Sequence, residues 1–106
     1  MQVAASAPRE DVFTATVRAL VKCGYQISHT DRESGIVVGA RPLKQALTGR
    51  EAGGMIRVTI LIEESRGLSN LHFTWTPPEG ALGSFKKEHT ELVRELSMAL
   101  PGVAIR

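Results

Sequence analysis

The spacing of hydrophobic residues changes at a glycine in the first quarter of the chain. As far as Cys23 they recur every three or four residues, the period of an amphipathic helix, and from Tyr25 they alternate with polar residues. Gly24 lies at the change, and glycine is the residue that most often ends a helix in the left-handed conformation. The pattern predicts a helix over residues 7–23 and a strand over residues 25–30.

Three more segments are predicted to be strands, two of them with alternating apolar and polar residues, and turn residues separate them. The first follows the turn Asp31-Arg32-Glu33-Ser34-Gly35, and the last follows the turn Ser65-Arg66-Gly67. A second apolar helical face begins at Ser84 and ends before Pro101-Gly102. The predicted strands cover residues 35–41, 55–64 and 70–76.

This order of elements predicts an α+β two-layer sandwich, helix-β-β-β-β-helix, with a four-stranded antiparallel sheet. Both helices are expected on the sheet face that carries Ile56, Val58, Ile60, Ile62, Phe73 and Trp75. The other face is expected to be mostly polar. We expect residues 1–106 to form a single domain, with residues 1–6 as a flexible tether and residues 42–54 as a long loop.

Composition limits the class of protein more than its function. The chain has 106 residues, a formal charge of +2, and 13 basic against 11 acidic residues, which is close to balance. That balance argues against a dedicated nucleic-acid binder, because such proteins carry a denser cationic surface. No run approaches the roughly 20 apolar residues of a membrane span. Cys23 is the single cysteine, so it says nothing about the compartment.

Several short sequences resemble a pattern found in small bacterial envelope domains, including the BamC (NlpB) lipoprotein family. They are Val12-Phe13, Arg18-Ala19-Leu20, Gly24-Tyr25 and Asp31-Arg32-Glu33-Ser34-Gly35-Ile36. The resemblance implies a helix-grip-like domain that binds or scaffolds without catalysis. The chain shows no lipobox cysteine and no export signal. We therefore expect it to be cytoplasmic if it is complete, and periplasmic or outer-membrane-associated if it is a trimmed envelope domain.

The chemically reactive side chains do not form a recognisable catalytic or metal-binding pattern. Cys23, with His29 or His89 as its base, is one arrangement for a nucleophile, but a helix C-terminus disfavours a thiolate, and packing is the simpler role. The histidines lack the short spacing of metal ligands on one element. We therefore predict no catalytic residue, no cofactor and no metal, and the protein is not expected to be an enzyme.

Basic residues gather around the predicted loop and the strand that follows it. With two residues of the exposed sheet face they form the predicted partner-binding site, which comprises Arg41, Lys44, Arg50, Arg57, Thr59 and Leu61. Val37 is expected on the same exposed face. A long loop in a small domain is where binding residues most often lie.

Three functions remain open from the sequence. The first is a protein-binding or assembly module with a protein partner, which includes a homodimer through the open sheet face. The second is a carrier of a small apolar ligand or lipid, in a pocket lined by Phe73, Trp75 and Phe85. The third is a weak nucleic-acid or anionic-surface binder that uses the loop at 42–54.

Overall fold

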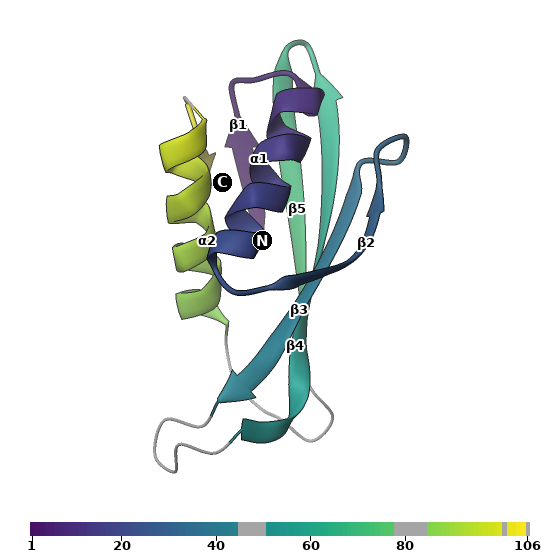
Figure 1. Cartoon of the computed structure of the whole chain (residues 1–106). Helices are drawn as coiled ribbons and strands as arrows, with labels where there is room; N and C mark the ends of the chain where they lie inside the picture. The colour runs from purple at the N-terminus through teal and green to yellow at the C-terminus, as the bar shows by residue number, and fades with distance from the viewer. Residues whose placement is uncertain (45–50, 78–84, 101, 106) are drawn as a thin grey trace.

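The computed structural model describes residues 1–44, 51–77, 85–100 and 102–105 (Figure 1). Its elements are β1 (Gln2–Ala5), α1 (Arg9–Lys22), β2 (Gln26–Asp31), β3 (Ile36–Lys44), β4 (Glu51–Ser65), β5 (Leu68–Thr76), α2 (Lys86–Ala99) and β6 (Ala104–Ile105). The strands form one antiparallel sheet in the order β2-β3-β4-β5-β1-β6. The predicted α+β class and antiparallel pairing are confirmed, and the sheet has six strands where four were expected.

The two helices lie side by side against one face of the sheet (Figure 1). Ile56, Val58, Ile60 and Ile62 point toward the helices and are at most 2% exposed. Their neighbours on β4 point to the other face, as the period of two in a strand requires. The predicted position of both helices is therefore confirmed. Neither described helix is long and apolar enough to cross a membrane.

The N-terminal segment is part of the sheet and not the flexible tether expected for residues 1–6. β1 lies between β5 and β6, and its Val3 pairs with Leu71 on one side and Ile105 on the other. Val3 and Ala5 are fully buried. A four-residue strand is too short for its alternation to stand out, and its partner lies far away in the sequence, so no local pattern predicts it.

The expected loop at 42–54 is also largely strand. β3 continues through Pro42 to Lys44 and β4 begins at Glu51, so only residues 45–50 of the expected loop lie outside the described residues. The register shifts between Pro42 and Lys44. Such an irregularity is where a strand tolerates proline, and for that reason Pro42 did not end the strand as predicted.

Val37 lies on the opposite face from the one expected. It is fully buried beneath the helices, whereas Ile36 and Val38 point to the uncovered face. Three consecutive apolar residues at 36–38 carry no alternation, so the sequence cannot assign their faces. The pairing of Ile36 with Leu61 decides the assignment.

Gly24 ends α1 as predicted. Its φ of 87° is left-handed, and its N–H donates to the Val21 carbonyl at 3.1 Å. The Tyr25 N–H donates to the Leu20 carbonyl at 2.9 Å. These two hydrogen bonds form a Schellman motif, which turns the chain directly from α1 toward β2.

The turn between β2 and β3 is tied to its surroundings by hydrogen bonds. The Asp31 carboxylate accepts from the Ser34 N–H and hydroxyl, and these hydrogen bonds lower the pKa of Asp31. Gly35 follows at a φ of 74°, and its carbonyl accepts from the Ile62 N–H at 2.7 Å. The Arg9 guanidinium donates to two carbonyls of the turn. The start of α1, the β2–β3 turn and β4 are therefore joined at one point.

Candidate functional site

The sheet face that points away from both helices, here called the open face, carries a stripe of apolar side chains. Alternate residues of β3 point to it, and all of them are apolar: Ile36, Val38, Ala40 and Pro42. β4 adds Leu61 and Met55, which pair with the two ends of this stripe. No helix in the described part of the chain covers these residues.

The stripe is only partly shielded by its neighbours. Met55 is 43% exposed, and Ile36, Val38 and Leu61 are half-buried. Polar residues border the stripe: His29 and Asp31 on β2, and His72 and Thr74 on β5. An apolar centre with a polar border is the usual composition of a protein interaction surface.

Three of the predicted site residues lie together on the open face. Arg57, Thr59 and Leu61 are alternate residues of β4, and they pair with Ala40, Val38 and Ile36 respectively. Arg57 is exposed, and the other two are half-buried. The structure therefore joins these residues to the β3 stripe.

The remaining predicted residues do not join this group in the described structure. Arg41 pairs with Ile56 and so points to the helix side, opposite to Arg57. Lys44 is at the end of β3, across from Glu51. Arg50 lies outside the described residues. The expected cluster of Arg41 with Arg57 is wrong, because the register of β3 on β4 places their side chains on opposite faces.

Arg41 instead links β3 to the end of α1 and to α2. Its guanidinium lies 4.6 Å from the centre of the Tyr25 ring and donates to the Cys23 carbonyl at 2.6 Å. It also lies 3.5 Å from a carboxylate oxygen of Glu91. Only 23% of its side chain is exposed, so these contacts account for most of its surface. We assign Arg41 a structural role.

Cys23 is not placed as a nucleophile. Burial, reinforced by the negative charges of Glu91 and Glu95, raises the pKa of its thiol to about 11. Burial likewise raises the pKa of Tyr25 to about 12. A nucleophilic cysteine needs a thiolate near neutral pH, so this environment favours a packing role for Cys23.

The aromatic residues expected to line a carrier pocket contact one another. The Trp75 ring stacks on Phe85 with 6.0 Å between ring centres, and the His89 ring meets the Phe73 ring edge-on at 4.8 Å. The indole N–H of Trp75 donates to Nδ1 of His89 at 3.4 Å. These side chains therefore occupy the space in which the pocket was expected.

Two buried polar atoms near this aromatic cluster have no hydrogen-bond partner among the described residues. They are the hydroxyl of Tyr25 and Nε2 of His89, and both side chains are at least nine-tenths buried. Burial, with the nearby N-terminal ammonium, lowers the pKa of His89. The ring is therefore held neutral inside the core.

The described residues bring no metal-ligating group together. No three of the His, Cys, Asp and Glu side chains within the described ranges are close enough to hold a metal ion. His29 and His72 both point to the open face but from strands separated by β3 and β4, and His89 lies on the helix side.

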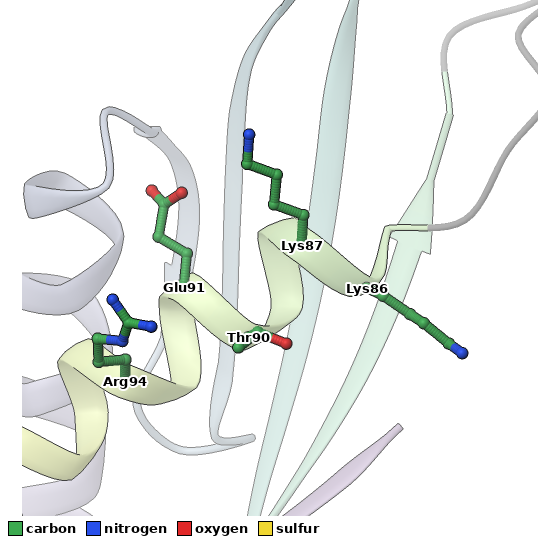
Figure 2. A pocket seen from close by; sticks show the side chains of 5 residues that line it. All are labelled: Lys86, Lys87, Thr90, Glu91 and Arg94. Carbon is green, nitrogen blue, oxygen red and sulfur yellow. The ribbon is translucent and has the colours of Figure 1, made fainter.

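The outer surface of α2 has a shallow hollow of about 420 Å³, lined by Lys86, Lys87, Thr90, Glu91 and Arg94. Figure 2 shows that all five side chains project from this single helix and that the two lysines diverge. Glu91 lies among the cations and offsets part of their charge. The surface is cationic without a concave site that would surround a ligand.

The predicted site does not include the β3 stripe or Met55. The period of two in a strand does indicate that Ile36, Val38 and Ala40 share a face. The sequence does not give the register that places this face beside Leu61 and Thr59. Only the pairing of β3 with β4 supplies that register.

Comparisons with known proteins show the fold. No protein-family model matches the chain, and no curated protein matches it. Among solved structures it is similar to a chain from the crystal structure of the adenylate sensor from AMP-activated protein kinase in complex with 5-aminoimidazole-4-carboxamide 1-beta-D-ribofuranotide. The TM-score is 0.64, and the match covers 88% of this chain and 92% of that chain. At 16% identity the likeness shows the fold alone.

Proposed function

We propose that this protein is a non-enzymatic protein-binding module and that its partner binds to the open face. The observation that carries the proposal is the β3 stripe, Ile36, Val38, Ala40 and Pro42, which lies uncovered on that face, one strand in from the β2 edge. A sheet with one face packed on helices normally presents polar residues on the other. Contiguous exposed apolar surface bordered by polar residues marks sites of protein interaction.

The predicted residues Arg57, Thr59 and Leu61 belong to this surface. Leu61 and Thr59 extend the apolar stripe onto β4, and Arg57 lies at its border. Border charges steer a partner and set specificity, while the apolar centre contributes most of the affinity. The expected envelope location belongs to the same proposal, and fractionation of the native host tests it.

The test compares two valine-to-glutamate variants. Val38→Glu places a charge in the centre of the stripe, and Val21→Glu makes the same change on α1, where the valine is 59% exposed and far from the open face. Immobilised wild-type protein is incubated with an extract of the native host, and each retained protein is purified and titrated against all three forms by calorimetry. We expect Val38→Glu to weaken binding at least about tenfold and Val21→Glu to leave it unchanged.

Circular dichroism verifies that both variants fold. A purified partner that binds Val38→Glu as tightly as wild type contradicts the proposed surface. A partner lost equally from both variants contradicts it as well.

A second candidate function is the binding of a small anionic ligand. Two observations favour it: the cationic surface of α2 formed by Lys86, Lys87 and Arg94, and the similar solved structure, whose name records a bound ribonucleotide. Adenosine monophosphate titrated into isotope-labelled protein should then shift the amide resonances of α2, and the double change Lys87→Glu with Arg94→Glu should abolish the shifts. Shifts that survive this change contradict the assignment to α2.

A further inference from the structure

The residues of the open face lie in rows that cross the sheet, and four of these rows lie between Ser65–Leu68 at one end and Pro42–Met55 at the other. Cross-strand pairing fixes each row. The first row is Glu63–Asn70–Ala4, the second is Asp31–Ile36–Leu61–His72–Gln2, the third is His29–Val38–Thr59–Thr74, and the fourth is Gln26–Ala40–Arg57–Thr76.

The charges are opposite on the two sides of the line between the second and third rows. On β4, Glu63 in the first row is anionic and Arg57 in the fourth is cationic. On β2, Asp31 in the second row is anionic, and His29 lies on the other side of the line in the third row. The apolar residues Ile36 and Val38 occupy the same two central rows.

A twofold axis along that line converts this arrangement into complementary contacts. The axis lies above the open face, parallel to the sheet and across the strands. Rotation by half a turn about it brings a second copy face to face with the first, with its rows in reverse order. The first row then lies over the fourth and the second over the third. Arg57 therefore meets Glu63 of the other copy, Asp31 meets His29, and Ile36 meets Val38.

We propose that the open face is a homodimer interface in which two copies stack sheet on sheet about this transverse twofold axis. A twofold interface requires a surface that is complementary to itself, and the reversed order of the rows provides it. A twofold axis parallel to the strands would instead place Arg57 over Ala40, leaving the charge without a partner. The inference rests on the proposed function, because it takes the open face as the binding surface and names its occupant.

The charged residues at the border are held in position for such contacts. The Glu63 carboxylate lies 3.3 Å from Nε2 of His72 on the same face, and Asp31 is fixed by its hydrogen bonds to Ser34. Ordered charges lose less side-chain entropy on binding than free ones.

The size of the face sets the expected strength. With strands about 4.8 Å apart and about 3.3 Å between residues, four rows that each cross about four strands cover roughly 500–600 Å² per copy in projection. The total area is then about 1,000–1,200 Å², the lower end for specific complexes. The dimer is therefore expected at high micromolar protein concentration.

Charge exchange tests the twofold arrangement. Sedimentation velocity is measured from about 10 µM to 1 mM at low salt for wild type, Arg57→Glu, Glu63→Arg and the double variant that carries both changes. Each single change creates two like-charge contacts in a symmetric dimer, so its dissociation constant should rise at least about tenfold. The double variant restores opposite charges and should recover wild-type association.

The other possible results contradict the homodimer, and they distinguish its failure from a failure of the proposed function. A wild type that stays monomeric at 1 mM, or a double variant as weak as the single ones, removes the transverse homodimer. The proposed function survives that result if a foreign partner still binds wild type and is lost from Val38→Glu. If Val38→Glu dimerises like wild type, the open face is not the homodimer interface and the inference fails, whereas binding of a foreign partner to Val38→Glu still decides the proposed function.

Discussion

Replacing Gly35 by alanine tests the junction between the β2–β3 turn and β4. At a φ of 74° a non-glycine residue costs about 1–2 kcal/mol. A Cβ at Gly35 would also collide with the backbone carbonyl of Ile62, so the turn must move and strain the hydrogen bond from the Ile62 N–H. Leaving the buried Ile62 N–H unpaired costs a further amount of about 1–3 kcal/mol. Reduced entropy of the unfolded chain returns about 0.4–1 kcal/mol, so we expect a net loss of about 1–4.5 kcal/mol.

Gly67→Ala provides the matched control for this change. Gly67 has a φ of 78°, but a Cβ there would meet nothing within 4 Å, so only the backbone cost applies, and we expect a loss of about 1 kcal/mol or less. Urea unfolding is followed by the fluorescence of Trp75, the single tryptophan, and by circular dichroism. Equal losses in the two variants, within about 0.5 kcal/mol, would refute the close contact between Gly35 and β4.

Two further predictions address the N-terminal strand and the buried histidine. Val3→Ala should destabilise the fold by about 1–3 kcal/mol because Val3 is fully buried, while Gln2→Ala on exposed surface should change stability by less than about 0.5 kcal/mol. If urea unfolding shows no loss of stability in Val3→Ala, residues 1–6 are a flexible tether and not a strand of the sheet. His89 has a pKa below its ordinary 6.5. As the pH falls, the unfolded chain therefore binds the proton before the folded protein does. The stability that the neutral ring contributes is full above about pH 7.5 and is lost as the pH falls through 6.5 toward the pKa of the folded state. His89→Phe should flatten the dependence of unfolding free energy on pH below about pH 7.5, and an unchanged slope contradicts the assignment.

The sequence predicts those parts of the fold that depend on neighbouring residues. Gly24 ends α1 because its left-handed conformation satisfies hydrogen bonds within the same few residues. The alternation over Ile56–Ile62 likewise records burial on one face of one strand. β1 escaped prediction because its four residues become a strand only by pairing with β5.

The candidate site was predicted less completely because it depends on register between strands. Arg41 and Arg57 are both basic residues near the expected loop, yet a one-residue difference in register decides which face each side chain occupies. Thr59 and Leu61 were assigned to the exposed face because β4 alternates clearly. Val37 was assigned wrongly because its apolar neighbours on both sides hide the alternation.

The position of β1 in the sheet has a consequence for synthesis on the ribosome. β2, β3, β4 and β5 each pair with the strand that follows or precedes them in the chain, so they can assemble in the order in which they emerge. β1 emerges first, but its partner β5 emerges after them. The nascent chain therefore carries an apolar strand without a partner until β2, β3, β4 and β5 have all been made. This interval is when the protein is most exposed to misassembly and to chaperones, although its finished β1 is among its most buried segments.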